Sequence, residues 1–150
     1  DRPGVLDPVK VERSPARRAC ARARPAFRPA VVRANAEEMA TLELPAGVVR
    51  AVTGAVDRVD VDGRSRRIEG GHPRMAEVTA MGCAGTGLVA AALAVEPDAF
   101  RATVTALLAL AVAGELAGEV ARGPGSFPAA FLDALHGLSA AQLVAGARIR

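Results

Sequence analysis

The sequence predicts an α/β protein whose sheet is largely parallel. Short apolar runs alternate with helix-like segments in the first half of the chain, one strong hairpin signal follows, and the second half has almost only helical patterns. A chain of 150 residues suffices for one domain that buries about 70% of the surface of its unfolded form. We therefore expect a single domain over residues 1–150, with a sheet in its first half and a mostly helical second half.

Three apolar runs are the predicted parallel strands, at residues 4–7, 30–33 and 48–54. They end in Asp7, in Arg33 and in the pair Thr53-Gly54. A β-hairpin is predicted over residues 55–70, because polarity alternates there around Asp62-Gly63. Ligands of open α/β sheets bind beyond the carboxyl ends of the strands, so the three strand ends point to one shared site.

Capping and turn residues mark the predicted helices. Ser14, Asn35 and Ser126 are each placed as an N-cap, and Gly137 is placed as a helix end. A glycine-rich turn within residues 78–88 opens a further helix. The predicted helices cover residues 14–23, 35–42, about 82–95, 97–121, 127–135 and 139–147.

Composition restricts the classes of partner. The net charge is +3, but 18 of the 19 basic residues are Arg and alanine is very abundant, a pattern typical of GC-rich coding. The basic segment 13–28 has no nucleic-acid motif, so we expect no nucleic-acid partner. The uncharged run Val78–Val95 approaches the length of a membrane span, but its three Gly, two Thr and one Cys favour a buried helix. No signal-peptide pattern is found, and we expect a cytoplasmic protein without membrane contact.

The two cysteines, Cys20 and Cys83, lack the spacing of a zinc site. Cys83 falls in the first turn of the glycine-opened helix, directly after Gly82. The free N–H groups and the dipole of a helix start favour a phosphate or a developing anion and would also favour the thiolate. The alternative is a small buried hydrophobic residue, which is the commoner fate of a lone cysteine.

The polar residues at the strand ends each have two interpretations. Glu38 either completes a capping box with Asn35 or binds Mg²⁺ near a phosphate, with Asp7 as the second carboxylate. Arg33 either clamps a phosphate or is a solvated edge charge. Thr53 either binds phosphate or turns the chain. His72 and His136 are isolated, and we expect structural roles for both.

Taken in order, several segments resemble the hydroxyethylthiazole kinases of the ribokinase-like superfamily. The matching stretches are VLDPV (5–9), VVRANAEEMA (31–40), AVTGAVD (51–57), GHPRMAEVTAMGC (71–83), EPDAF (96–100), VAGELA (112–117) and GPGSFPAAFLDAL (123–135). The resemblance implies a three-layer α-β-α fold. It also implies ATP- and Mg²⁺-dependent phosphorylation of the hydroxyl of 4-methyl-5-(2-hydroxyethyl)thiazole in thiamine biosynthesis or salvage, by a homotrimer with sites between subunits.

The resemblance also implies roles for particular residues. Arg33 and Thr53 match ATP-contacting positions, and Asp7 and Glu38 match acidic positions around Mg²⁺ and the phosphates. Cys83 matches the cysteine beside the anion hole, where most ribokinase-like kinases resemble one another in having Asp as the base. The backbone N–H groups near Gly82 and Cys83 are then expected to stabilise the transferring phosphoryl group. Ala80 matches a glycine that touches the thiazole.

The chain departs from the family pattern in sequence and in length. The family's Thr-Gly-Thr-Gly-Cys is here Thr79-Ala80-Met81-Gly82-Cys83. If φ is positive at residue 80, the methyl group of Ala80 is costly there. An N-terminal portion of the family pattern is absent and the stretch between Glu38 and Thr53 is short, so we expect an incomplete sheet. Two alternatives follow: a catalytically inactive kinase fragment that keeps part of the nucleotide site, or a related kinase for another alcohol, such as a hydroxymethylpyrimidine or pyridoxal.

Overall fold

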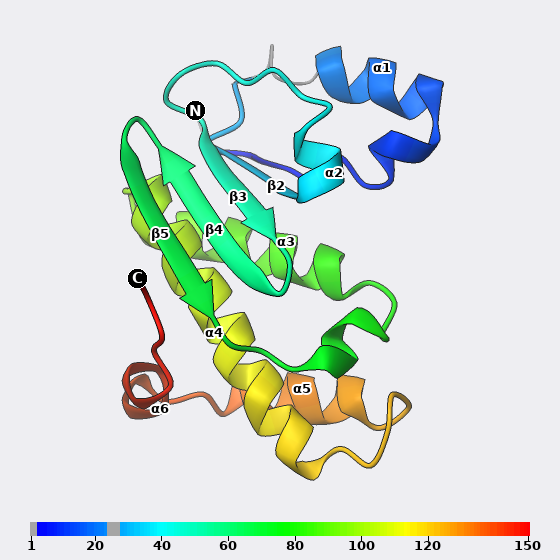
Figure 1. Ribbon diagram of the computed structural model, residues 1–150. Coiled ribbons are helices and arrows are strands. Elements are labelled where there is room, and N and C mark those ends of the chain that lie inside the picture. Colours follow the sequence, from blue (N-terminus) through cyan, green and yellow to red (C-terminus); the bar gives the residue numbers. More distant parts are fainter. Residues whose placement is uncertain (1–2, 24–27) are drawn as a thin grey trace.

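The computed structural model describes residues 3–23 and 28–150, and it contains one five-stranded sheet (Figure 1). The strands lie side by side in chain order, and the first three are parallel while the last two form an antiparallel hairpin. Their bounds are β1 Val5–Leu6, β2 Val31–Asn35, β3 Val49–Thr53, β4 Val56–Val61 and β5 Arg64–Glu69. The predicted α/β class, the positions of the strands and the hairpin are confirmed, but β2 continues two residues beyond its predicted end at Arg33.

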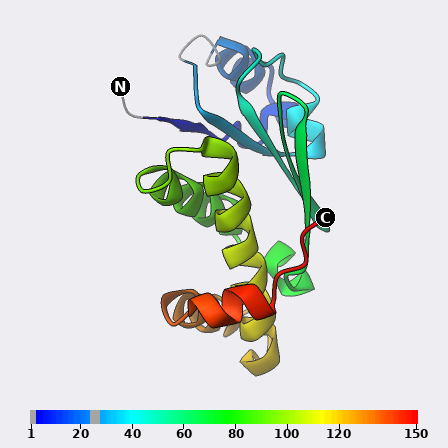
Figure 2. The ribbon, with the colours of Figure 1, turned by 90° about the vertical axis from the view of Figure 1, so that its left-hand side faces the viewer.

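Helices cover both faces of the sheet (Figure 2). The short helix η1, α1 and α2 pack on one face, whereas α3 and α4 cover the other and lie behind the sheet in Figure 1. Helices α5 and α6 pack against α4. The bounds are η1 Val11–Arg13, α1 Pro15–Ala23, α2 Ala36–Met39, η3 Pro73–Ala76, α3 Met81–Leu93, α4 Ala99–Val120, α5 Phe127–His136 and α6 Ala140–Ala145. The predicted three-layer α-β-α arrangement is confirmed.

Alternation along β2 divides its side chains between two hydrophobic cores. Val31 belongs to the core under α3 and α4, and Val32 and Ala34 belong to the core under η1, α1 and α2. Because successive strand residues point to opposite faces, Arg33 shares the face of Val31 and points towards α3. The strand pattern therefore directs one charged residue into a mostly apolar layer.

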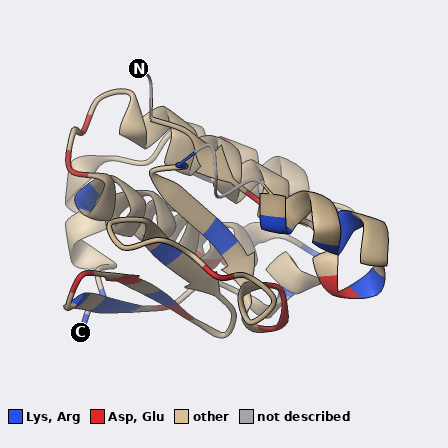
Figure 3. Ribbon diagram, turned by 90° about the horizontal axis from the view of Figure 1, so that it is seen from above, with Lys and Arg blue, Asp and Glu red and all other residues tan. Residues whose placement is uncertain are grey.

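The hairpin turn is set by Asp62 and Gly63, whose φ angles of 43° and 81° are both positive. Two such residues make the tight turn that matches the twist of antiparallel strands. Both acidic and basic residues occur on the hairpin of β4 and β5 (Figure 3). Residues 24–27 of the basic segment 13–28 lie outside the described part of the chain.

Helix α4 is the central apolar element, and it is long and apolar enough to cross a membrane by composition alone. Its packing explains this apolarity, because one side contacts the sheet and α3 and another contacts Phe127 and Phe131 of α5. Asp98 caps its start by accepting the N–H groups of Phe100 and Arg101.

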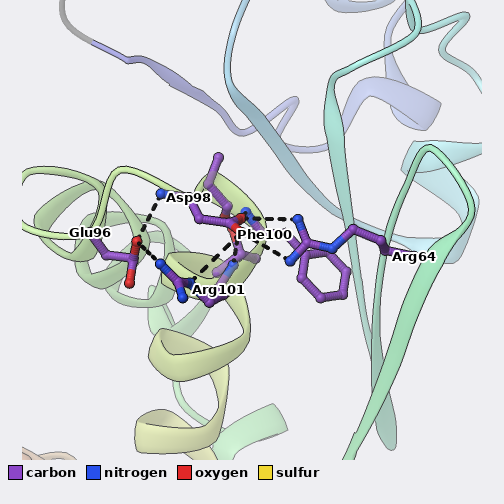
Figure 4. Close-up of polar contacts among 7 residues, drawn as sticks. Arg64, Glu96, Asp98, Phe100 and Arg101 are labelled. Atoms are coloured by element: carbon purple, nitrogen blue, oxygen red, sulfur yellow. Dashed lines mark hydrogen bonds and ion pairs between the residues drawn. The ribbon is translucent and has the colours of Figure 1, made fainter.

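The start of α4 is also tied to β5. Arg64 donates to both carboxylate oxygens of Asp98, and its guanidinium lies 4.2 Å from the ring centroid of Phe100 (Figure 4). The hydrogen bond from Arg64 is the largest of the effects that hold the pKa of Asp98 below its usual range. The bidentate pair therefore joins the hairpin to the helix that covers it.

Two local predictions need correction. Ser126 precedes α5 as predicted, but its hydroxyl does not cap the helix. Its backbone is already helical, and Oγ instead accepts the N–H groups of Arg122 and Gly123 and tightens the preceding turn. Helix α2 ends at Met39, earlier than the predicted Leu42, and the residues that follow it form turns.

The C-terminal residues cover the outer edge of β5. Arg67 and Arg150 exchange two backbone hydrogen bonds, and Ile68 forms an antiparallel bridge with Ile149. Such pairing shields an edge that would otherwise expose unpaired backbone groups.

Candidate active site

The structure brings Asp7, which directly follows β1, together with Arg33, the middle residue of β2. Nη1 of Arg33 lies 3.6 Å from Oδ2 of Asp7, and both side chains are only 14% exposed. An ion pair so poorly exposed to water is screened less than one on the surface. Arg33 is therefore neither a solvated edge charge nor freely mobile.

Two glycines of α3 allow the helix to lie directly on the guanidinium of Arg33. A Cβ at Gly82 would lie 3.2 Å from Nη1, and a Cβ at Gly85 would lie 3.3 Å from Nε and 3.1 Å from Cδ1 of Leu110. The Nε atom of Arg33 is buried and has no hydrogen-bond partner within the described residues. The glycines of the turn thus serve close packing over a positive charge.

Thr86 fixes the carboxylate of Asp7 from the helix side. Its hydroxyl donates to Oδ2 of Asp7 at 2.5 Å and lies 3.2 Å from the carbonyl oxygen of Gly82. Sequence reasoning did not single out Thr86, which is separated from Asp7 by 79 positions. The only available signal was a lone hydroxyl within an otherwise apolar helix.

The first turn of α3 presents unpaired donors near this ion pair. The first intrahelical bond runs from the N–H of Ala84 to the carbonyl of Ala80, so the N–H groups of Met81, Gly82 and Cys83 have no intrahelical acceptor. Cys83 is exposed, which contradicts the alternative of a small buried hydrophobic residue. Ala80 has φ 70° and ψ 4°, the left-handed conformation that the family's glycine would adopt without cost.

Glu38 has a structural role in the described structure. The predicted capping box is present: the N–H of Glu38 donates to Oδ1 of Asn35, and the N–H of Asn35 donates to Oε2 of Glu38. Oε1 accepts the N–H of Lys10 at 2.8 Å, and the residue is only 7% exposed. Glu38 therefore ties the chain after β1 to the chain after β2.

The described residues contain no cluster of three or more His, Cys, Asp or Glu side chains placed to hold a metal ion. Asp7 and Glu38 have separate partners, and no contact joins them directly. A divalent cation at this site would need oxygens from a bound phosphate in addition to these carboxylates.

Thr53 lies at the end of β3, on the same face of the sheet as Arg33. The parallel register pairs Arg33 with Ala51 and Asn35 with Thr53, so Arg33 and Thr53 occupy adjacent strands. The Thr53 hydroxyl is 3.5 Å from the carbonyl oxygen of Ala34, a long contact that leaves the group partly exposed.

Asp57 of β4 is a further acidic residue that the sequence did not indicate. Its Oδ1 accepts the N–H of Gly54 at 2.9 Å. Burial raises the pKa of Asp57, while the bond from Gly54 and the nearby charge of Arg33 partly oppose this effect. Arg33 therefore lies in the field of two carboxylates.

The histidines lie away from these groups. His72 accepts the N–H of Arg74 through Nδ1 and stacks on Phe127 with ring centroids 5.7 Å apart, and Gly118 leaves room for its ring. His136 lies in the last turn of α5.

An arginine, a carboxylate and the start of a helix meet at the ends of parallel strands, an arrangement typical of α/β proteins that bind phosphate groups. Comparison with known proteins identifies the family more closely. The model of the hydroxyethylthiazole kinase family matches residues 44–141, and the chain belongs to this family.

Relatives and a solved structure agree with this assignment. A probable hydroxyethylthiazole kinase of Agrobacterium fabrum is 44% identical over 148 residues, which are 99% of this chain and 60% of that protein. A hydroxyethylthiazole kinase of Cereibacter sphaeroides is 42% identical over 174 aligned positions, and the alignment covers 99% of this chain and 66% of that protein. The structure of hydroxyethylthiazole kinase from Pyrococcus horikoshii OT3 superimposes with a TM-score of 0.90 at 27% identity. The match covers 99% of this chain and 65% of that chain.

The chain spans less than two thirds of each of these relatives. The aligned stretch of 174 residues in the Cereibacter protein is longer than this chain of 150, so that relative has internal residues with no counterpart here. The stretch shared with the Agrobacterium protein, 148 residues, is no longer than the chain itself.

Proposed function

We propose that this protein is an ATP-dependent kinase that phosphorylates the hydroxyl of 4-methyl-5-(2-hydroxyethyl)thiazole, within one hydroxyethylthiazole-kinase-like domain. One observation carries the proposal: in a chain of this family, Arg33, Asp7 and the free N–H groups of α3 converge at the strand ends. The relatives are named hydroxyethylthiazole kinases, which supports the thiazole alcohol over a pyrimidine or pyridoxal substrate.

Phosphoryl transfer depends mainly on positioning and on stabilising negative charge. In the proposed site, Arg33 and Thr53 hold the nucleotide phosphates. The N–H groups of Gly82 and Cys83 receive the transferring phosphoryl group, aided by the positive end of the α3 dipole. The exposed side chain of Cys83 orients the substrate hydroxyl as a thiol, or accepts its proton as a thiolate, and Ala80 contacts the thiazole ring.

Mg²⁺ is the metal that this chemistry requires, and when bound it neutralises charge on the phosphate oxygens. Asp7 fits this role, because Thr86 and Arg33 both approach Oδ2 and leave Oδ1 without a contact within the described residues. Each oxygen of Glu38 already accepts one backbone N–H, so Glu38 would act on the ion through a bridging water.

A homotrimer with sites between subunits and a cytoplasmic location complete the proposal, both by analogy with the family. Light scattering on the purified chain, with and without ATP, measures the oligomeric state. A trimeric mass supports this part of the proposal, and a monomeric mass in both conditions contradicts it.

An ADP-release assay with Mg²⁺ and ATP tests the activity. We expect ADP formation that depends on the thiazole alcohol and exceeds the rate with hydroxymethylpyrimidine or pyridoxal. Absence of thiazole-dependent ADP in a folded sample, together with absence of ATP binding, contradicts the proposal.

A further inference from the structure

Asp57 is a partly buried carboxylate to which the proposed chemistry gives no role. In the antiparallel register it pairs with Ile68, and Val59, two residues further on, pairs with Ala51. Ile68, Val59 and Ala51 are all buried in the core under α4. Paired residues of adjacent strands share a face, so Asp57 points into the layer that also holds Arg33 and Thr53.

The carboxylate of Asp57 contacts the backbone beside Thr53, and it shares a face of the sheet with Arg33. Its Oδ1 accepts the N–H of Gly54, the residue that directly follows Thr53, and this bond fixes the turn between β3 and β4. The positive charge of Arg33, on the same face of the sheet, partly opposes the effect of burial on the pKa of Asp57.

Partial burial of this carboxylate costs folding free energy, which argues against a role that is limited to fixing the turn. Burial disfavours its ionised form and raises its pKa. Asp62, at the opposite end of the hairpin, accepts the N–H of Gly47 from an exposed position. An exposed aspartate therefore suffices to fix a backbone N–H in this same fold.

We infer that Asp57 is a positioning residue for the nucleotide: it holds the backbone after Thr53, on the face of the sheet that also carries Arg33. The inference rests on the proposed function. Asp57 touches neither of the reacting groups, so it acts on the affinity for ATP, with little effect on the affinity for the thiazole alcohol.

Two variants and a matched control test this role. Asp57→Ala removes the acceptor and the charge, whereas Asp57→Asn keeps an oxygen that can accept the N–H of Gly54 and removes only the charge. Asp60→Ala on the same strand is the control, because Asp60 pairs with exposed Arg58 and Ser65 on the other face. KM for ATP, KM for the thiazole, kcat, the dissociation constant of ATP and the melting temperature are measured for each.

We expect Asp57→Ala to raise KM and the dissociation constant for ATP by about tenfold, the effect of one charge-assisted hydrogen bond. Asp57→Asn should show a smaller increase, and KM for the thiazole should change less than twofold in both. If Asp57→Ala fails to fold, Asp57→Asn still gives the comparison with the control.

Three outcomes overturn the inference. If the wild type turns over but both Asp57 variants bind ATP as the control does, the inference is wrong and the proposed function stands. If kcat and the melting temperature fall while KM for ATP and KM for the thiazole rise together, the role of Asp57 is only structural. If the folded wild type neither binds ATP nor turns over, the proposed function and the inference fail together.

Discussion

At the scale of single residues, Ala80 shows how one methyl group departs from the family pattern inside the site. Its φ of 70° is a conformation that costs an L-residue roughly 1–2 kcal/mol, and glycine adopts it freely. The strain lies at the first residue before α3, directly beside the proposed phosphate donors. The site therefore contains local backbone strain, which a substitution of Ala80 by glycine can relieve.

We expect Ala80→Gly to raise the free energy of unfolding by up to about 1 kcal/mol, after the greater flexibility of the unfolded chain is subtracted. Thermal denaturation should show a rise in melting temperature of roughly 2–4 °C. The control is Ala84→Gly, at an exposed helical position of the same helix, which should lose about 1 kcal/mol. Equal losses in both variants would contradict the strain at Ala80.

The Cys83→Ser variant tests whether the thiol takes part in the reaction. Because the thiol is proposed to act on the substrate hydroxyl, kcat should fall by roughly 10- to 100-fold, and KM for ATP should change little. Cys20→Ser, on α1 at the opposite face of the sheet, should retain wild-type turnover. Full turnover by Cys83→Ser would remove the thiol from the chemistry.

The raised pKa of Asp57 predicts how the folding stability of the protein depends on pH. The folded state disfavours the ionised carboxylate, so the residue lowers stability above its folded pKa, and this cost disappears below the ordinary value of 3.8. Asp57→Asn should therefore melt at a higher temperature than the wild type at neutral pH, and the two should converge as pH falls below 3.8. A variant that is less stable than the wild type at neutral pH would show that the Arg33 charge outweighs burial.

At the scale of elements, the close contact between α3 and the sheet depends on individual glycines. Gly85 is buried against Leu110 and Arg33, whereas Gly87, half a turn further on, is exposed and has no neighbour within 4 Å of an added Cβ. The two glycines therefore differ in their packing: Gly85 lies against other side chains, and Gly87 faces open space.

Gly85→Ala and Gly87→Ala form a matched pair. Gly85→Ala should destabilise the protein by about 1–3 kcal/mol through overpacking and should weaken ATP binding by displacing Arg33. Gly87→Ala should stabilise it by up to about 1 kcal/mol through helix propensity. Chemical denaturation measures both, and stabilisation by Gly85→Ala would show that α3 can move away from Arg33 at no cost.

At the scale of the whole molecule, the sequence predicted the elements well where the signal is local. The hairpin was predicted from Asp62-Gly63 and the capping box from Asn35 and Glu38. The end of β1 before Asp7 was also predicted, whereas Arg33 lies in the middle of β2 and not at its end. The prediction that Ser126 caps α5 was wrong. Serine is common both at helix caps and in the turn before a helix, and only the backbone angles distinguish the two positions.

The sequence by itself determined the class of fold, the order of elements and, through the family resemblance, the residues proposed for the chemistry. Tertiary structure alone decided that Thr86 binds Asp7, that α3 lies on Arg33 and that Asp57 shares a face of the sheet with this arginine. The reason is physical: capping, turns and alternation act over a few residues. Contacts between distant segments depend on sheet register and helix packing, which no local pattern records.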